Sequence, residues 1–363
     1  MTKPKRTTNV DVADRGETTT FSQSDGLVRL LAQQGAAIMF SSYQSGLLYM
    51  LGHIANGGAH LHQSAMAKPM GIWVEDDNAF TLSAGYQIMR FKNGLEPHER
   101  VNQQFDACFA PRETQVTGEL DAHDIGVDRN GQPIFVNTRF NCLATTDPRH
   151  SFRELWRPPF ISALVDEDRC HLNGLAMENG EAAYVTAVSR SDTIDGWRDR
   201  RDNGGVVIDV RSGAIVCEGL SMPHSPRWHD GKLWVLQSGL GTLSTVDSAT
   251  GSITQVAELP GFTRGLAFIG RYALVGLSQV RESVFAGLPI TSRADERNCG
   301  VWVVDTQTGA IVGLLRFRGA VQEIFDVKVL PGATWPTIVT DPEVLASSFV
   351  LSPAAMEQLA KPS

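Results

Sequence analysis

Short runs of apolar and β-branched residues, each ended by a turn dipeptide, recur along most of the chain. The clearest group covers residues 224–257, where four such runs are separated by turns that include Asp230-Gly231 and Thr250-Gly251. Runs of about five residues closed by Asp-Gly or Thr-Gly turns are typical of an antiparallel four-stranded meander. Such a meander has the dimensions of one blade of a β-propeller.

The same pattern returns elsewhere, as a propeller requires, because a single meander cannot bury both of its faces. Segments that resemble the first hairpin of the blade begin at Gly71, Asp124, Gly174 and Gly265. The second hairpin recurs at residues 205–217 and 301–313, each time as a strand, an Asp, a turn ending in Gly and another strand. The pattern predicts an all-β fold, a six-bladed β-propeller.

The two ends of the chain complement each other in this pattern. Residues 37–63 align with the second to fourth strands of a blade but lack a first strand. Residues 323–330 resemble a first, inner strand with little of a meander after it. We therefore predict that the C-terminal inner strand joins the N-terminal strands, which closes the ring and leaves no open sheet edge.

The domain organisation follows from this closure. Residues 24–363 are predicted to form a single propeller domain, because every blade needs two neighbours. Residues 1–23 contain too few apolar side chains to offset the entropy of ordering and are predicted to be a disordered arm. A short helix is predicted just after it, with Ser24 at the N-cap and Gly35 at the C-terminal end.

Three polar segments interrupt the repeats and are predicted to surround one mouth of the central channel. They are residues 157–170, 189–203 and 279–298. Connections between blades and between second and third strands leave the same end of a propeller, where binding loops on a rigid scaffold are expected.

Composition narrows the classes of partner. The chain has 32 Lys and Arg against 40 Asp and Glu, with no basic block beyond residues 3–6, so no nucleic-acid partner is predicted. The sequence has no apolar run of about 18 residues and no apolar signal segment, which predicts a cytoplasmic protein with no membrane partner. The five cysteines lack metal-type spacing and are predicted to be reduced structural thiols. No nucleotide-binding motif is present, so no nucleotide cofactor is expected.

Aligning the six inner strands brings one residue of each blade to the mouth of the channel. This column reads Met70, His123, Asn173, His224, Arg264 and Phe325. Asp124 and Asp326 follow the column by one residue, and Glu323 precedes it by two. Folding of a blade does not require such polar groups on one axis, and burying them costs free energy unless they find partners. The column is therefore the predicted functional site.

Three interpretations of the column stay open. One is a divalent metal ion held by His123, Asn173, His224 and Glu323. Mixed nitrogen and oxygen ligands favour zinc, manganese or iron over calcium. Another is proton transfer without a metal, in which the catalytic residues would be His123, His224, Arg264 and Asp124. The third is a set of side chains that plugs the channel or forms a plain binding site.

Four further residues are predicted to contact the substrate: Tyr43, Asn137, Arg139 and Asp326. The first three follow second strands that return to the mouth. The predicted function is an enzyme, a hydrolase, lyase or isomerase, that acts on a small molecule or a peptide segment. The alternative is a non-catalytic propeller that binds a ligand or another protein.

Residues 171–176, His-Leu-Asn-Gly-Leu-Ala, resemble the Pro-Asn-Gly-Leu-Ala motif of the gluconolactonase and senescence-marker superfamily of six-bladed propellers. In that superfamily the Asn is a metal ligand, so the resemblance implies the same role for Asn173. The present sequence departs from the family because histidines replace carboxylates or amides in the column. The resemblance therefore implies the fold more than calcium binding or lactonase activity.

A closer likeness, from about Gly26 onward, is to a bacterial family of conserved hypothetical propeller proteins. It is carried by residues 136–140, 157–161, 170–174, 222–229, 260–265 and 323–326. This resemblance implies the same propeller fold and no settled activity.

Overall fold

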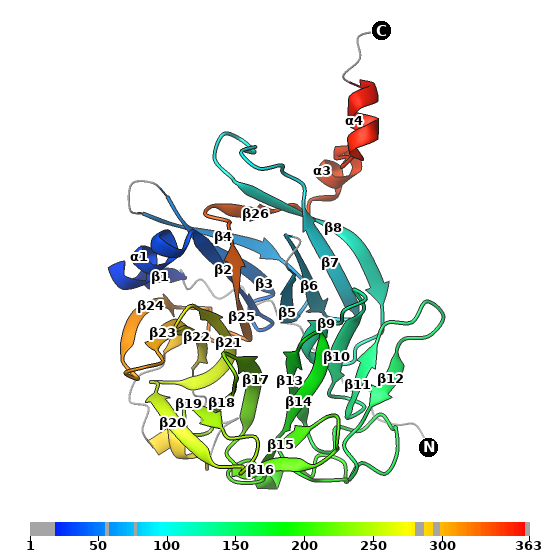
Figure 1. The fold of residues 1–363 in the computed structure, drawn as a ribbon, viewed down its shortest axis with the longest axis vertical. Helices are drawn as coiled ribbons and strands as arrows, with labels where there is room; N and C mark the ends of the chain where they lie inside the picture. The colour runs from blue at the N-terminus through cyan, green and yellow to red at the C-terminus, as the bar shows by residue number, and fades with distance from the viewer. Residues whose placement is uncertain (1–18, 55–57, 76–77, 280–286, 293–297, 360–363) are drawn as a thin grey trace.

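The computed structural model describes residues 19–54, 58–75, 78–279, 287–292 and 298–359, and in this part of the chain six sheets surround a common centre (Figure 1). The first blade contains β25 (Asp326–Pro331), β2 (Ala36–Ser42), β3 (Leu47–His53) and β4 (Ala59–Ala65). The second contains β5 (Pro69–Glu75), β6 (Ala79–Ala84), β7 (Gln87–Asn93) and β8 (Ala107–Val116). The third contains β9 (Ala122–Val127), β10 (Pro133–Asn137), β11 (Cys142–Thr145) and β12 (Arg153–Trp156). The predicted six-bladed β-propeller is confirmed.

The remaining three blades follow in chain order. The fourth contains β13 (Leu172–Glu178), β14 (Glu181–Ala187), β15 (Gly205–Asp209) and β16 (Ile215–Leu220). The fifth contains β17 (Pro223–His229), β18 (Lys232–Gln237), β19 (Thr242–Val246) and β20 (Ile253–Glu258). The sixth contains β21 (Phe262–Ile269), β22 (Tyr272–Ser278), β23 (Cys299–Asp305) and β24 (Ile311–Arg318). The first strand named in each blade is its inner strand.

The ring closes as the sequence pattern indicates. Strand β25 pairs antiparallel with β2, with Asp326 opposite Ser41 and Leu330 opposite Ala37. The first blade therefore joins both ends of the chain, and no inner strand is left without a neighbour.

The repeated Asp-x-x-x-Gly turns have one local cause. After β15, β19 and β23 the backbone N–H of the glycine donates to the carbonyl of the Asp at 2.8 Å, and the glycine has a φ of 72° or 73°. The glycines are Gly213, Gly251 and Gly309. A residue without a side chain adopts this left-handed conformation at little cost, which explains why the pattern was readable from the sequence.

Neighbouring blades pack through apolar side chains and are also linked by hydroxyl groups. Phe80 stacks on Phe91 with ring centroids 4.7 Å apart, inside a buried cluster that joins the first and second blades. At five junctions between described blades, a Ser or Thr near the end of a second strand donates to a carbonyl at the entrance of the next inner strand. The donors are Ser41, Ser83, Thr138, Ser238 and Ser278.

Helix α1 (Asp25–Gln34) begins after Ser24, whose hydroxyl accepts from the backbone N–H of Leu27, and ends at Gly35 in the left-handed region, as predicted. Residues 1–18 of the predicted arm lie outside the described part. The prediction is wrong for β1 (Thr20–Gln23), which pairs with β24 as a fifth strand of the sixth blade. The short segment is ordered because an exposed sheet edge offers it backbone partners.

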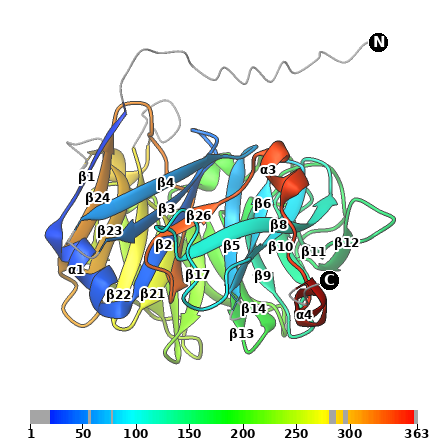
Figure 2. The ribbon, with the colours of Figure 1, turned by 90° about the horizontal axis from the view of Figure 1, so that it is seen from above.

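The C-terminal region extends beyond the six meanders. Strand β26 (Pro336–Ile338) pairs parallel with β8 on the edge of the second blade. Helices α3 (Pro342–Ser347) and α4 (Pro353–Leu359) follow and extend outward beyond β8 of the second blade (Figure 1). In Figure 2 they lie toward the right of the view, whereas α1 and β1 lie at the left. Two 3₁₀ helices, Arg198–Arg200 and Pro289–Ser292, lie in the long connections.

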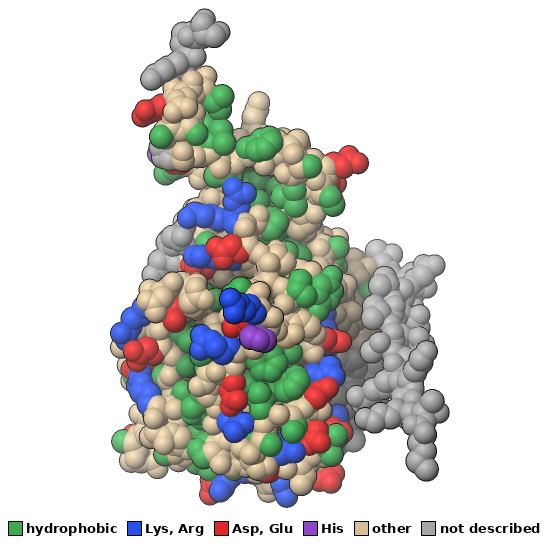
Figure 3. All heavy atoms as spheres, turned by 90° about the vertical axis from the view of Figure 1, so that its right-hand side faces the viewer, with side chains coloured by type: hydrophobic (Ala, Val, Ile, Leu, Met, Phe, Trp, Pro, Cys, Tyr) green, Lys and Arg blue, Asp and Glu red, His purple; other side chains and the backbone are tan. Residues whose placement is uncertain are grey.

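Acidic and basic side chains are interspersed on the face of the molecule shown in Figure 3. Of the helices in the described residues, none has the length and apolar character needed to cross a membrane.

Candidate active site at the channel mouth

The predicted column begins the inner strands, and its two histidines are held in the same way. Nδ1 of His123 lies 2.8 Å from the carbonyl oxygen of Asp121 and 2.9 Å from Oγ1 of Thr138. Nδ1 of His224 lies 3.0 Å from the carbonyl oxygen of Met222 and 2.8 Å from Oγ of Ser238. The site therefore contains one motif twice, in blades separated by the fourth.

The local backbone explains this geometry. The residue two positions before the column has a left-handed φ in four blades, at Lys68, Asp121, His171 and Met222, with values between 44° and 55°. This conformation turns the carbonyl of Asp121 or Met222 toward the imidazole that follows. Non-glycine residues adopt the left-handed region at a cost, so its repetition indicates a constraint from the surrounding structure.

The hydroxyl partners decide which imidazole nitrogen carries the proton. Thr138 Oγ1 donates to the carbonyl of Leu172 at 2.6 Å, and Ser238 Oγ donates to the carbonyl of Thr263 at 2.5 Å. Because each hydroxyl proton is used there, each hydroxyl oxygen accepts from Nδ1–H, and the neutral ring keeps its lone pair on Nε2. Within the described residues, neither Nε2 has a hydrogen-bond partner.

Both imidazoles are neutral at ordinary pH. Burial lowers the pKa of His123 to about 3; Asp121 opposes this shift, while the charges of Arg264 and His171 add to it. Burial also lowers the pKa of His224 well below its usual value, with the charges of Arg264 and His171 contributing. Arg264 and His171 therefore lie within electrostatic range of both imidazoles.

Arg264 supplies a positive charge beside the histidines. Its guanidinium carbon lies 3.6 Å from the centre of the Phe325 ring. No hydrogen-bond or ion-pair partner of this guanidinium occurs among the residues that the structure describes. A guanidinium without such partners is suited to bind a carboxylate or another planar anion.

Aromatic rings enclose the polar groups. The ring centroid of His123 lies 5.4 Å from that of Phe325 and 4.9 Å from that of His171. The ring of His171 stacks on Trp197, with a centroid distance of 4.2 Å. Nδ1 of His171 also lies 2.7 Å from the carboxylate of Asp168. The sequence analysis did not include His171 and Trp197 among the site residues. His171 could have been included, because it stands two residues before the column, as Asp121 does.

The residues predicted to hold a metal ion have the following surroundings in the structure. Oδ1 of Asn173 accepts from the Thr186 hydroxyl at 2.7 Å, and its Nδ2, which can only donate, is buried without a hydrogen-bond partner in the described residues. Glu323 is also buried. No three His, Cys, Asp or Glu side chains in the described part of the chain are grouped so that they could hold a metal ion. In the described residues His123, His224 and Glu323 are therefore not grouped as a preformed centre around Asn173, and a metal ion at the mouth stays a prediction.

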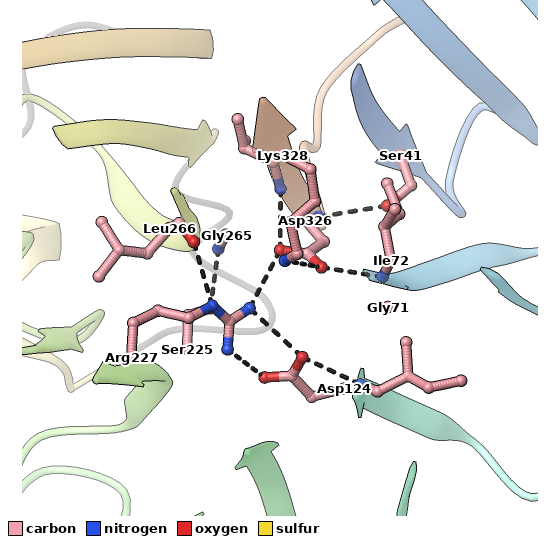
Figure 4. Close-up of polar contacts among 12 residues, drawn as sticks. Ser41, Gly71, Ile72, Asp124, Ser225, Arg227, Gly265, Leu266, Asp326 and Lys328 are labelled. Atoms are coloured by element: carbon pink, nitrogen blue, oxygen red, sulfur yellow. Dashed lines mark hydrogen bonds and ion pairs between the residues drawn. The ribbon is translucent and has the colours of Figure 1, made fainter. Parts of the chain in front are cut away.

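Asp124 and Asp326 lie deeper in the channel, where both contact Arg227 (Figure 4). Arg227 Nη1 is 2.7 Å from the carboxylate of Asp124, and Nη2 is 3.3 Å from that of Asp326. Lys328 Nζ lies 2.6 Å from Asp326. Burial by itself lowers the pKa of Arg227, but the two carboxylates outweigh burial and raise it. The carboxylates predicted to be catalytic or substrate-binding are thus already neutralised by partners that sequence reasoning missed.

This ionic group, Asp124, Arg227, Asp326 and Lys328, is named the channel plug below. It touches all six inner strands. Arg227 donates to the carbonyls of Leu266 and Leu175 at 3.1 and 2.9 Å, and Asp326 accepts from the backbone N–H of Ile72 at 2.9 Å. The channel plug lies in the middle of the channel, below the histidines, and is formed by residues that follow the column instead of by the column itself.

The predicted substrate-binding residues at the rim have different environments. Tyr43 lies beside Phe325, with ring centroids 5.5 Å apart. Arg139 forms an ion pair with Asp166 instead of facing the histidines. Asn137 is fully buried, and its Oδ1 accepts from the backbone N–H of Phe140 at 3.1 Å. Only Tyr43 of these three contacts a ring of the column.

The three long connections meet at this mouth, as predicted. Asp195 donates its backbone N–H to the carbonyl of Asp168 at 2.9 Å. Trp197 packs in one buried cluster with Leu288 and Ile290. Residues 280–286 and 293–297 of the third connection lie outside the described part.

The family model described as "Domain of unknown function (DUF4915)" matches residues 25–339. The chain belongs to this family. The predicted membership of a propeller family with no settled activity is thereby confirmed. No curated protein matched the sequence.

One solved structure supports the architecture of this DUF4915 protein. The crystal structure of a nidogen/laminin complex matches with a TM-score of 0.51 and 11% identity, over 82% of this chain and 99% of that chain. Two structures of virginiamycin B lyase from Staphylococcus aureus, a catalytically inactive form with quinupristin and a selenomethionine form, match with TM-scores of 0.42 and 0.39. Both are 12% identical over 83% of this chain and 99% of the lyase. The first likeness supports the fold alone, and the other two do not bear on activity.

Proposed function

We propose that this DUF4915 protein is an enzyme that transfers a proton to or from an anionic small molecule or peptide segment bound at the channel mouth. The observation that carries the proposal is the pair of identically supported imidazoles beside a guanidinium without a partner in the described residues. His123 and His224 each direct a proton-accepting Nε2 away from their Nδ1 anchors. A packed channel needs no such arrangement.

Arg264 is the proposed anion-binding residue. Its fork of N–H groups matches a carboxylate, and the Phe325 ring beneath it fixes the plane of the guanidinium. A substrate carboxylate there would lie next to the histidines, since the charge of Arg264 lowers the pKa of both.

Substrate binding would also change the basicity of the histidines. The anion would offset the positive charge of Arg264, which is one cause of the low imidazole pKa values. Each pKa would then rise, so that Nε2 becomes a stronger base only when the anionic substrate is present. Proton abstraction from carbon leads to a lyase or isomerase, and proton abstraction from water leads to a hydrolase.

A non-catalytic binding propeller is the second candidate. The low pKa values favour it, because neutral imidazoles with a free lone pair are good hydrogen-bond acceptors even when they are weak bases.

The test is an incubation of the protein with a defined mixture of carboxylate-bearing compounds, followed by mass spectrometry. We expect at least one compound to be converted by the wild type, and by neither His123→Gln nor His224→Gln. The control His150→Gln changes an exposed histidine and should keep full activity. Binding without conversion in the wild type, lost in Arg264→Gln, would support the binding propeller instead.

A further inference from the structure

The end of the channel opposite the histidines contains a second candidate site. A cavity of about 760 Å³ lies there, lined by residues from the far ends of inner strands. They include Trp73, Trp228, His229, Phe268 and Lys328. Ligand sites for small molecules commonly have volumes of roughly 300–1,000 Å³. The channel plug separates this cavity from the mouth, because Arg227 and Lys328 belong to both the plug and the cavity wall.

Lys328 has unused donors in this wall. Its ammonium group has three N–H donors, and one is accepted by Asp326 at 2.6 Å. The other two have no partner among the described residues, although the side chain is only 10% exposed. Burial, followed by the charge of Arg227, lowers the pKa of Lys328, while Asp326 and Asp124 oppose the shift. An anion beside Nζ would reduce the free-energy cost of burying the charged ammonium group.

The other charged groups of the cavity wall are already engaged. Arg227 donates from all three of its nitrogens to carbonyls and carboxylates. Glu75 pairs with Arg90, and Asp106 accepts from the backbone N–H groups of Thr334 and Trp335. Lys328 is therefore the charged group of this wall with donors to spare within the described residues.

The apolar part of the wall is aromatic. His229 stacks on Phe268 with ring centroids 4.1 Å apart and planes 5° apart. Trp73 and Trp228 line the same cavity. Flat ring surfaces favour a flat, aromatic ligand body, which packs by offset stacking or edge to face.

We propose that this cavity binds an aromatic carboxylate, whose acid group accepts hydrogen bonds from Lys328 Nζ and whose ring packs among Trp73, Trp228 and Phe268. The site is distinct from the channel mouth and does not depend on the function proposed there.

Isothermal titration with naphthalene carboxylate, and with neutral naphthalene carboxamide of the same shape, tests the site in the full-length protein. We expect the carboxylate to bind the wild type at least about tenfold more tightly than the amide, because hydrogen bonds to charged groups are the strong ones. Lys328→Met should remove this preference. The matched control Lys232→Met, which alters an exposed lysine, should keep it.

A second pair of variants protects the test against a folding defect in Lys328→Met. Phe268→Ala removes part of the aromatic wall without touching the plug and should weaken binding of both compounds. Its matched control Tyr86→Ala, which alters an exposed aromatic residue outside the cavity wall, should change the binding of neither compound. No binding to the wild type, an unchanged preference in folded Lys328→Met, unchanged binding in folded Phe268→Ala, or an equal loss of binding in Tyr86→Ala would each overturn the proposal.

Discussion

Two hydroxyl groups at the channel mouth each form one hydrogen bond to the next blade and one to a histidine. Thr138 and Ser238 each join their blade to the next by donating to a carbonyl, and each accepts from the Nδ1–H of a histidine. The same atom therefore couples the assembly of the ring to the tautomer of the candidate base. Serine or threonine can fill this role because a hydroxyl donates and accepts at once.

The buried histidines make stability depend on pH, and the direction follows from their lowered pKa values. In the unfolded chain a histidine has a pKa of about 6.5, whereas folded His123 has a pKa of about 3. The unfolded state therefore binds more protons between these values. The stabilisation is complete above pH 6.5 and is lost as the pH falls toward 3, by about 1.4 kcal/mol per pH unit for each such residue.

We predict that the free energy of unfolding of the wild type falls by at least about 2 kcal/mol between pH 6.5 and 4.5 because of His123. Urea unfolding at several pH values measures this loss. His123→Gln should show a shallower dependence, and His150→Gln should follow the wild type. Parallel curves for all three proteins would contradict the low pKa of His123.

At the scale of elements, the third long connection is more than a polar segment at the rim. Its middle part, which includes the 3₁₀ helix Pro289–Ser292, inserts Leu288 and Ile290 into a buried cluster with Trp197 and Phe262. The sequence prediction treated residues 279–298 as a polar excursion and overlooked these two side chains. Their burial packs the second and third long connections against each other and against the sixth blade.

We predict that Leu288→Ala or Ile290→Ala lowers the free energy of unfolding by about 2–5 kcal/mol, since each leaves a cavity in a packed cluster. Ser292→Ala, in the same segment but exposed, should change it by less than about 0.5 kcal/mol. Thermal and urea unfolding of the three variants measure the difference. Equal, small effects in all three would contradict a packing role of Leu288 and Ile290.

The closing strand β25 gives the second prediction at this scale. Truncation after Val321 removes β25, together with Asp326 and Lys328 of the channel plug, and should abolish cooperative unfolding. Truncation after Thr340 removes only α3, α4 and the residues around them, and should leave the transition cooperative. Calorimetry distinguishes the two. An unchanged melting transition in the shorter protein would refute closure by β25.

At the scale of the whole molecule, the channel plug connects all six blades through one guanidinium and two carboxylates. Arg227 and Asp124 are 103 positions apart in the chain, so their ion pair forms only when the ring is nearly complete. Buried pairs of this kind add little over apolar packing while intact, but the loss of one partner leaves a buried charge. The plug therefore favours the closed ring over partly assembled ones.

We predict that Arg227→Met destabilises the protein by about 3–5 kcal/mol. Among the described residues, Asp124 loses its only side-chain cation and Asp326 loses one of two. Arg227→Lys should recover little of this loss, since an ammonium group cannot reproduce the planar fork. Arg139→Gln breaks an exposed ion pair and should cost less than about 1 kcal/mol. Urea unfolding compares them, and a mild Arg227→Met variant would show that the plug is dispensable.

The sequence by itself determined the repeat, the blade boundaries and the way the ring closes. These features depend on local patterns: alternating apolar residues, Asp-x-x-x-Gly turns whose glycine needs a positive φ, and an unmatched inner strand at residues 323–330. The column also emerged from the sequence, because inner strands in register bring equivalent residues to one mouth. For the same reason, the sequence alone predicts His123, His224 and Arg264 at the mouth.

Only the tertiary structure decided which of these groups contact one another. Asp124 and Asp326 follow the column by a single residue, yet they lie in the plug because Arg227 from another blade reaches them across the channel. His171, Trp197 and Lys328 joined their sites through contacts between blades that carry no local signal. The physical reason is that burial makes an unpaired charge costly, so each ionic group is placed by whichever partner the closed ring brings within reach.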